Sequence, residues 1–298
     1  MKLPLSAFII TQNEELRLPR CLDSLVPWVG EIVLVDAGST DRTVEIAESY
    51  GARVVRRHWT GYGPQKRFAE QLCHYDWVLN VDADEVLTPE SAAEIQSLFD
   101  GEEPAPAAYR VRILNVYPGQ IRPRLWANDY NVVRLYHRSV ASYSDDPVYD
   151  RVDIGKGRPE QLKAPIYHYT NISVAHAVQK ALAFSKFRAE TSGARSIPLL
   201  KLRLFLEFPM VFFKTYIGRR HFTGGWQGYY FALCHAFMRT TRIALLLEDR
   251  QGELRQIVRN PASGEDQSHN SQRLTRMHQL SFRCRGWMAL KRSDNAKP

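Results

Sequence analysis

Apolar residues along the first ninety positions fall into short continuous runs separated by longer amphipathic stretches. The runs are LSAFIIT (5–11), EIVLVD (31–36), ARVVRRHW (52–59) and DWVLNVD (76–82). The stretches between them have the period of helices and are NEELRLPRCLDSL (13–25), TVEIAESYG (43–51) and PQKRFAEQLCHY (64–75). Continuous apolar strands that alternate with single helices predict βαβ units, and therefore an α/β fold with a mostly parallel sheet and helices on both faces.

Single residues mark the expected ends of several helices. Asn13 would open the first helix, and Pro19 is expected to interrupt or kink it. Gly51 is a typical residue just past the end of the second helix. Thr88 is the expected N-cap of a further helix over residues 88–100.

The pattern changes after residue 100. Residues 109–119 and 131–139 alternate between apolar and polar with a period of two, which is typical of half-exposed strands. An amphipathic helix is predicted over 173–194, and a second helical region, rich in Phe and Arg, over 199–247. From Gln251 the chain is polar and basic, so we expect partial disorder. These changes predict a domain over 1–171 with halves 1–100 and 101–171, a helical extension over 172–250, and a tail over 251–298.

Composition and charge limit the class of protein without selecting a function. The 298 residues carry a formal net charge of +8, which favours phosphorylated substrates, anionic membranes or nucleic acid as partners. The four cysteines are far apart and lack metal-ligand spacing, so we expect reduced thiols in a cytosolic protein. No stretch approaches 18 uncharged apolar residues and no signal peptide is evident, which predicts a cytoplasmic protein without a transmembrane helix.

Polar clusters follow three of the predicted strands. They are Thr11–Glu14, Asp36–Asp41 and Asp82–Glu85. Ligands of parallel sheets bind beyond the carboxyl ends of the strands, so three clusters that meet there suggest a binding site. Each cluster alone also fits a simple turn, and Ser39 or Thr40 could merely cap the following helix.

The Asp82-x-Asp84 pair suits a divalent cation. A spacing of two residues would place both carboxylates on one side of the chain if the strand geometry persists. Mg²⁺ and Mn²⁺ prefer carboxylate, water and phosphate oxygens, and a diphosphate could complete the shell. The alternative is a solvated acidic turn, because such triplets often occur by chance.

The combined motifs resemble glycosyltransferase family 2, whose catalytic domain has the GT-A fold. The resemblance lies in FIITQNEELRLPRCLDSL, EIVLVDAGSTDRTVEIAESYGARV, GYGPQKRFAEQ and DWVLNVDADE, in this order. It is strong over residues 3–90 and weaker through VYDRVDIG and IYHYTNIS. It returns in FFKTYIGRRHFTGGWQGYYFALCHAFMRTTRIALLLE, and the whole is similar to the lipopolysaccharide core β-1,4-glucosyltransferase branch.

The resemblance implies roles for the first two clusters. Thr11, Glu14 and Asp36 would hold the uridine and ribose of a UDP-sugar donor. Gly38 and Ser39 would shape the turn that lets the nucleotide approach. The implied enzyme is inverting and metal-dependent, with Mg²⁺ or Mn²⁺ as its cofactor.

The resemblance also assigns roles around the third cluster. Gln65 and Lys66 would lie beside the nucleotide-sugar, where a lysine near a diphosphate is electrostatically favourable. Asp82 would contact the ribose and the metal, Ala83 would adjoin the nucleotide-sugar, and Asp84 would coordinate the metal directly. Lys66 alone could equally be a solvated charge at the start of a helix.

Inverting transfer needs a carboxylate that takes the proton of the acceptor hydroxyl. The segment SDDPVYDRVD supplies four acids, of which Asp150 is favoured and Asp146 comes second. The family often has Val-His-Glu here, and this chain has Val148-Tyr149-Asp150, which leaves the identity of the base open. Glu85 is a further candidate for contact with the acceptor.

His168, in IYHYT, is a third candidate metal ligand, after Asp84 and Asp82. A histidine near the metal or diphosphate occurs in related enzymes. A single histidine between aromatic residues is more often a packed, hydrogen-bonded residue.

The helical extension mixes aromatic and basic residues. Such a surface can lie in a membrane interface and attract anionic headgroups, which would suit a glycolipid acceptor such as the lipopolysaccharide inner core and a peripheral position on the cytoplasmic face of the inner membrane. The same residues could instead form the core of a helical subdomain with a charged rim.

Other functions have weaker support in the sequence. A polyprenyl-phosphate glycosyltransferase would typically add membrane-spanning helices, and a sugar nucleotidyltransferase a Gly-rich basic loop where this chain has TQNEE. Another polysaccharide glycosyltransferase of the same fold also remains an alternative. A non-enzymatic protein that binds membrane or nucleic acid is disfavoured, because bare carboxylates in DADE would repel phosphates. We therefore expect no nucleic-acid partner.

Overall fold

The computed structural model describes residues 2–259, apart from 102, 128, 147–149 and 191–195. The chain forms two compact units. The first contains residues 1–116, 120–123 and 129–170, and the second contains 117–119, 124–128 and the chain from 171 onward. Each unit is described by itself.

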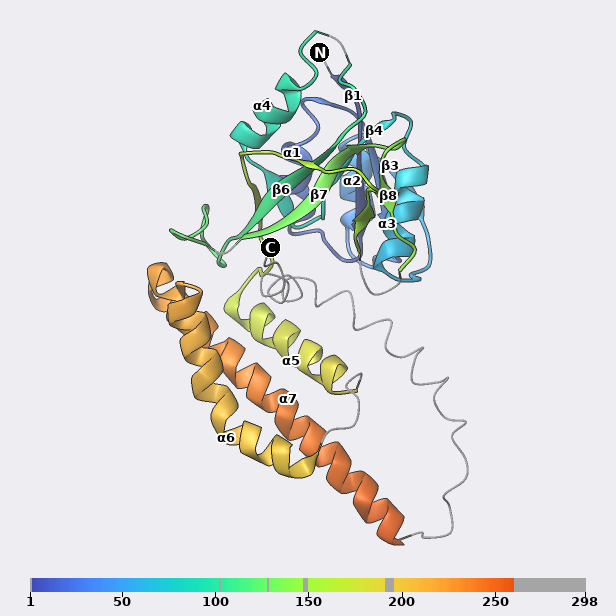
Figure 1. The fold of residues 1–298 in the computed structure, drawn as a ribbon. Helices are drawn as coiled ribbons and strands as arrows, with labels where there is room; N and C mark the ends of the chain where they lie inside the picture. The colour runs from blue at the N-terminus through green and yellow to red at the C-terminus, as the bar shows by residue number, and fades with distance from the viewer. Residues whose placement is uncertain (1, 102, 128, 147–149, 191–195, 260–298) are drawn as a thin grey trace. The chain divides into compact units, whose positions relative to one another are not determined.

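A mixed sheet forms the centre of the first unit (Figure 1). Its strands are β1 (Leu3–Thr11), β2 (Val29–Asp36), β3 (Arg53–Arg56), β4 (Trp77–Asn80), β5 (Glu85–Leu87), β6 (Ala108–Asn115), β7 (Asp129–His137), β10 (Glu160–Gln161) and β11 (Ile166–His168). The order is β3-β2-β1-β4-β7-β6-β11-β5, and β10 pairs with β6. The first four strands in this order are parallel, whereas β7 runs antiparallel to both of its neighbours.

Helices cover both faces of this sheet, which confirms the predicted fold class. They are α1 (Leu18–Asp23), α2 (Thr43–Ser49), α3 (Tyr62–Gln71) and α4 (Pro89–Ser97). On one face, Leu5, Ala7 and Ile9 of β1 share a buried cluster with residues of α1, α2 and α4. Phe8 points to the opposite face, because side chains alternate along a strand. Its ring lies edge-on to Tyr143 of the short strand β8 (Ser142–Tyr143), which α3 contacts and which pairs with β9 (Val152–Asp153).

The helix predicted over residues 13–25 is shorter in the structure. Asn13 has a φ of 56°, a left-handed conformation that cannot open an α-helix. Pro19 lies in the first turn of α1, where a missing N–H costs no helical hydrogen bond. Pro19 therefore starts this helix rather than kinking it. Two other predicted ends are confirmed, since Gly51 follows α2 with a φ of 76° and the Thr88 side chain caps α4 by accepting from the Ser91 amide.

The second unit is helical. It contains α5 (Val174–Glu190), α6 (Ile197–Phe213), the π-helical turn η1 (Lys214–Gly218), the 3-10 turn η2 (His221–Gly224) and α7 (Gly225–Arg259). Leu200 of α6 packs with Ile243 and Leu246 of α7 in a small buried cluster. The helix α7 continues past residue 251, where the tail was expected to begin; the rest of the predicted tail, with Cys284, lies outside the described residues. None of the helices in the described part is both long and apolar enough to cross a bilayer.

Part of the connection between β6 and β7 belongs to the second unit. The Tyr117 ring stacks on Phe231 with 5.0 Å between centroids, and its hydroxyl lies 2.7 Å from His221 Nδ1. The Arg124 guanidinium donates to the carbonyls of Arg219 and Arg220, at 2.7 and 2.9 Å. These contacts fix the segment on the end of η1.

Candidate active site

The first two polar clusters meet at the carboxyl ends of β1 and β2. Thr11 and Asp36 are partners in the parallel register, and the Thr11 hydroxyl donates to Asp36 Oδ1 at 3.4 Å. The amide of Asn13 donates to Ser39 Oγ at 2.9 Å, and the amide of Thr40 donates to Asn13 Oδ1 at 2.8 Å. The two loops are therefore joined by their side chains.

Asp36 uses its carboxylate to build the turn that follows β2. Oδ2 accepts from the amides of Gly38 and Ser39, both at 2.9 Å, and Oδ1 also accepts from the Ser39 hydroxyl. Gly38 has a φ of 94°, which L-residues with side chains rarely adopt. The alternative that Ser39 or Thr40 caps α2 is wrong, because the first amide of α2, that of Thr43, donates to Asp41 Oδ1 at 3.0 Å.

An arginine that the sequence did not single out joins the first cluster to the third. Arg17 forms an ion pair with Glu14 at 2.7 Å and a longer one with Asp84 Oδ2 at 3.3 Å. It also donates to the Thr170 carbonyl at 3.0 Å. Its spacing from Glu14 is the signal that could have identified it, because side chains three residues apart in a helical turn can form an ion pair.

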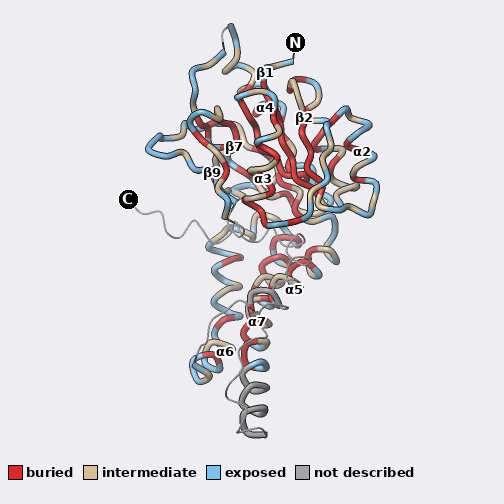
Figure 2. The backbone as a smooth tube through the Cα atoms, turned by 90° about the vertical axis from the view of Figure 1, so that its right-hand side faces the viewer, coloured by how far each residue is buried: buried red, intermediate tan, exposed pale blue. Residues whose placement is uncertain are grey.

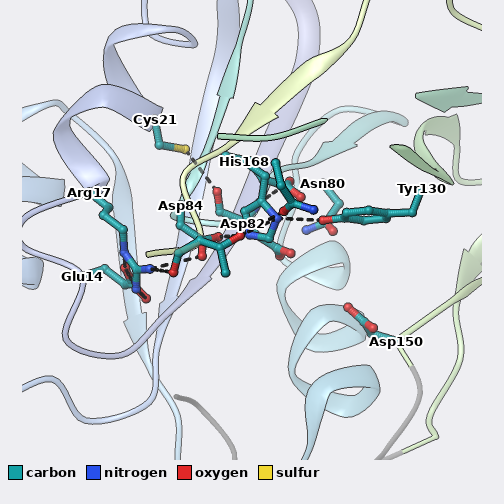
Figure 3. Close-up of polar contacts among 12 residues, drawn as sticks. Glu14, Arg17, Cys21, Asn80, Asp82, Asp84, Tyr130, Asp150 and His168 are labelled. Atoms are coloured by element: carbon teal, nitrogen blue, oxygen red, sulfur yellow. Dashed lines mark hydrogen bonds and ion pairs between the residues drawn. The ribbon is translucent and has the colours of Figure 1, made fainter. Parts of the chain in front are cut away.

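The expectation that Asp82 and Asp84 share one side of an extended chain is wrong. The strand β4 ends at Asn80, and residues 82–85 form a turn in which the Glu85 amide donates to the Asp82 carbonyl at 2.8 Å. The Glu85 carboxylate accepts from the Asp82 amide at 3.0 Å and so closes the turn. As a result, the two aspartates face different partners (Figure 3).

Asp82 lies between two buried cations. Lys66 Nζ is 2.9 Å from its Oδ1, and Arg134 Nη2 is 3.1 Å from its Oδ2. Arg134 also forms a 2.6 Å ion pair with Glu85, which is fully buried. Burial raises the pKa of the Glu85 carboxyl, and the Arg134 guanidinium opposes this shift. Arg134 was not predicted, because β7 alternates between apolar and polar residues and an arginine in such a strand normally faces water.

Asp84 lies beside His168, at the end of β11. His168 Nε2 is 3.2 Å from Asp84 Oδ1 and, in the described part of the chain, is buried without a hydrogen-bond partner. The other ring nitrogen, Nδ1, is 3.0 Å from the Tyr130 hydroxyl and 3.2 Å from the Thr170 hydroxyl. Figure 3 shows His168 between Asp84 and Tyr130.

The two hydroxyls beside Nδ1 differ in what they can do: that of Tyr130 can donate to Nδ1 or accept from it, whereas that of Thr170 has another acceptor. The Thr170 hydroxyl donates its proton to Asn115 Oδ1 at 3.0 Å, so toward His168 it acts as an acceptor. This contact favours the tautomer with the imidazole proton on Nδ1, which would leave the lone pair of Nε2 for an ion held beside Asp84. This is the arrangement that metal-binding histidines have, with a hydrogen bond at the second nitrogen.

Two of the three predicted metal ligands fit a divalent cation. Asp84 and His168 offer one carboxylate oxygen and one orphaned imidazole nitrogen, while Asp82 is occupied by Lys66 and Arg134. Within the described residues, no three His, Cys, Asp or Glu side chains are grouped to hold an ion. Mg²⁺ or Mn²⁺ at this pair would therefore need oxygens from a diphosphate and water.

Gln65 and Ala83 are buried near these groups. The Gln65 amide donates to the Arg57 carbonyl at 3.3 Å, and its Oε1 has no partner within the described structure. Ala83 is 4% exposed. A buried carbonyl oxygen without a donor costs free energy, so Gln65 is available to a ligand that brings an N–H or O–H.

The favoured base lies on the segment after β8. Asp150, whose side chain is 39% exposed, forms a 2.8 Å ion pair with the buried Lys66, which thus bridges it to Asp82. Val148 and Tyr149 of the family triplet lie outside the described residues. Asp146 packs by its backbone on α3, where a Cβ on Gly63 would be only 2.4 Å from the carbonyl oxygens of Ser144 and Asp146. Glycine at this position therefore permits the acidic segment to approach the lysine.

One of the cysteines contacts the turn that carries Asp82. Cys21, Cys73 and Cys234 are free. The Cys21 thiol donates to the Asp82 carbonyl at 3.6 Å, and burial raises its pKa well above the usual value. Cys21 is therefore held as a thiol that packs against the turn rather than as a reactive thiolate.

A family model and several known proteins that resemble this chain are all described as glycosyltransferases. The family model described as "Glycosyl transferase family 2" matches residues 6–153. An uncharacterized glycosyltransferase of Rickettsia felis is 35% identical over 275 residues, which are 89% of this chain and 97% of that protein. The lipopolysaccharide core biosynthesis glycosyltransferase LpsC of Rhizobium meliloti is 48% identical over 91 residues, 29% of this chain and 33% of that protein. Among solved structures, the match to S. aureus TarS 1–349 covers 85% of this chain and 92% of the TarS chain, with 16% identity and a TM-score of 0.42.

Proposed function

Because the chain belongs to glycosyl transferase family 2, we propose that it moves a sugar, glucose in our proposal, from a UDP-sugar to a glycolipid acceptor. One observation supports this most: three strand-end clusters meet at a site where the Asp84 carboxylate and the orphaned Nε2 of His168 lie 3.2 Å apart, with Lys66 close by. Such a site offers both a cation position and positive side chains for a diphosphate.

The donor would occupy the loops after β1, β2 and β4. We assign the uridine and ribose to Thr11, Glu14 and Asp36, with the turn at Gly38 and Ser39 beneath them. The Asp36 carboxylate is already saturated by this turn, so we propose that it acts by shaping the loop. The remaining donor contacts are assigned to Gln65, Lys66, Asp82 and Ala83.

Asp84 and His168 would hold Mg²⁺ or Mn²⁺, with Asp82 held away from the ion by its own cations. When bound, the ion would neutralise charge on the departing diphosphate. Asn115 and Thr170 would keep the Nε2 lone pair of His168 available, and Arg17 would balance the charge of Glu14 and Asp84.

In the transfer, we propose that Asp150 accepts the proton of the acceptor hydroxyl. That oxygen forms the new bond to the anomeric carbon as the bond to the UDP oxygen breaks, and UDP leaves. The Lys66 ammonium, 2.8 Å from Asp150, stabilises the carboxylate and weakens it as a base. A diphosphate that attracts Lys66 would relieve this and link donor binding to activation of Asp150. Asp146 and Glu85 are the second and third candidates; Glu85 is fully buried against Arg134, which disfavours it.

We propose a lipopolysaccharide inner core as the acceptor and peripheral contact with anionic lipid on the cytoplasmic face of the inner membrane. The similarity to LpsC, a lipopolysaccharide core biosynthesis glycosyltransferase, supports this acceptor over the 91 residues that match. The basic composition of the second unit supports the membrane contact.

UDP release from a panel of UDP-sugars, with deacylated lipopolysaccharide core as acceptor, tests this function. We expect acceptor-dependent UDP release with UDP-glucose, its loss in Asp150→Asn with donor binding intact, and normal turnover in the control Asp145→Asn, since Asp145 lies on the same segment and is mostly exposed. Turnover retained in Asp150→Asn would reassign the base to Asp146. No release with any UDP-sugar would overturn the proposal.

A further inference from the structure

The outer face of α6 is apolar although it is exposed. Seven large apolar side chains recur at steps of three or four residues, so they form one stripe along α6 and η1. The stripe consists of Leu199, Leu202, Leu206, Met210, Phe213 and Ile217, with Phe205, 78% exposed, at its edge. Only Leu200 and Glu207 of α6 are buried, and Figure 2 colours most of the helix as exposed or intermediate.

Exposed aromatic residues follow the stripe at the start of α7. They are Trp226 and Tyr229, and Phe222 of η2 directly precedes them; Trp226 is 69% exposed. A helix with apolar residues on both faces is normally buried on both, either in a large core or in lipid. The inner face of α6 already packs on α7, so among the described residues the outer face is the one that nothing covers.

Charge on this part of the chain has one sign. Residues 197–242 contain a single acid, Glu207, which is buried in ion pairs with Arg203 and Arg239 at 2.8 and 2.6 Å. The same range contains seven basic residues, namely Lys201, Arg203, Lys214, Arg219, Arg220, Arg239 and Arg242. Lys201, Lys214 and Arg220 are exposed beside the stripe. Exposed apolar and aromatic groups bordered by cations have the composition of a helix that lies in an anionic membrane interface.

Charge also disfavours two other occupants. A second copy of the chain would place one cationic surface against another. Residues 260–298 contain seven basic and three acidic side chains, so that segment is also positively charged. Anionic lipid is the partner that complements both the apolar stripe and its basic border.

We propose that α6, η1, η2 and the start of α7 form the membrane-binding surface, with the stripe at the boundary of headgroups and acyl chains and the exposed cations on lipid phosphates. This inference rests on the membrane contact proposed above and specifies the surface that makes it. Lys201, Arg203 and Glu207 interrupt the apolar character of α6, so the helix lies along the interface rather than across the bilayer.

Flotation of the full-length chain with vesicles tests this surface. We expect binding to vesicles of phosphatidylglycerol and phosphatidylcholine, weaker binding to phosphatidylcholine alone, and a decline with added salt. Phe205→Ser combined with Phe213→Ser should weaken partitioning by about tenfold or more, because both rings would lose lipid contact. The matched control, Ile121→Ser with Val140→Ser, removes exposed apolar side chains from the first unit and should bind as the parent does.

The outcomes separate the inference from the proposed function. Equal binding to neutral and anionic vesicles, or unchanged binding of the double Phe variant, would overturn the membrane surface. A second result would also overturn it: sedimentation without vesicles in which the parent protein is a dimer and the double Phe variant is a monomer. UDP release with the deacylated, soluble acceptor should persist in the double Phe variant. If the parent protein binds anionic vesicles but releases no UDP with this acceptor, only the transferase proposal is overturned.

Discussion

In the first unit a buried cation lies between two acids, whereas in the second unit a buried acid lies between two cations. Arg134 contacts Asp82 and Glu85, and Glu207 contacts Arg203 and Arg239. The net charges of the two parts of the chain also differ, the first being negative and the second positive. Residues 1–170 contain 19 basic and 24 acidic side chains, and residues 171–298 contain 21 and 8. The overall charge of +8 therefore conceals an acidic part and a strongly basic part.

This contrast suggests separate tasks for the two parts. In the first unit Asp82, Asp84 and Glu85 lie together after β4, where Lys66, Arg134 and Arg17 neutralise them. They would suit a cation and a diphosphate, which bring their own compensating charges. The second unit instead leaves apolar and basic side chains outside, as a lipid-facing surface requires. The net charge alone would have pointed to one anionic partner for the whole chain.

Replacing the buried cation should have the largest effect. Arg134→Met leaves the carboxylates of Asp82 and Glu85 buried without their shared partner, which typically costs about 3–5 kcal/mol. We expect a loss of that size in the free energy of unfolding, measured by urea denaturation. Arg138→Met, which breaks the exposed pair with Asp76, should cost less than about 1 kcal/mol. A small effect for Arg134→Met would mean that the two acids are compensated by other groups.

Replacing the buried acid of the second unit, Glu207, should lower the free energy of unfolding by less than replacing Arg134. Glu207→Gln deletes a charge that Arg203 and Arg239 share, but both arginines are about a quarter exposed and can turn to water. We expect a loss of about 1.5–3 kcal/mol, the range for hydrogen bonds to charged groups. Denaturation followed by far-UV circular dichroism would report it, because the second unit is helical. A loss as large as that of Arg134→Met would remove the asymmetry between the two units.

The hydrogen-bond chain behind His168 predicts a smaller effect, on metal affinity. Thr170→Val removes the acceptor that fixes the imidazole proton on Nδ1, so Mn²⁺ affinity in the presence of UDP should fall about tenfold, or about 1.4 kcal/mol. Electron paramagnetic resonance of free Mn²⁺ measures this directly. Thr170→Ser keeps the hydroxyl and serves as control. Equal affinities in the two variants would remove Thr170 from this role.

The second unit should also lose stability in acid. Burial lowers the pKa of His221 to about 3, so the folded chain leaves it neutral while the unfolded chain protonates it below about pH 6.5. Stability is therefore constant above pH 7.5 and declines as pH falls below 6.5. The loss for one such histidine is about 1 kcal/mol between pH 7 and 5.5.

Urea denaturation at pH 7 and 5.5 would show this dependence. His221→Asn should reduce it, whereas the exposed His58→Asn should not. The same pH dependence in His221→Asn would assign the loss to other groups, among them His235, whose pKa burial also lowers to about 3.

Regular patterns account for what could be predicted. The apolar runs of β1, β2 and β4 and the helices between them follow from local periodicity, so the strand-end clusters could be placed at one edge of the sheet. In the structure Glu14 and Asp84 both pair with Arg17, and Asp36 contacts Thr11 at the end of the neighbouring strand. The direction and position of β7 were not predicted, because strand pairing over about fifty residues leaves no local pattern, and Arg134 was missed with it.

Turn geometry and outward-facing surfaces account for the rest. The turn over residues 82–85 separates Asp82 from Asp84, and spacing alone could not show where β4 ends. The apolar face of α6 was indistinguishable from a core face in the sequence, because periodicity does not say which side is covered. Only the folded structure shows that this face is exposed.

Calorimetric titration with UDP tests the central claim most directly, first with Mn²⁺ and then with EDTA. We predict binding with Mn²⁺, much weaker binding with EDTA, and loss of the Mn²⁺ dependence in Asp84→Asn while the fold remains intact. UDP binding that is equally strong with EDTA and in Asp84→Asn, or no UDP binding in either condition, would contradict the assignment of a metal–nucleotide site to the ends of these strands.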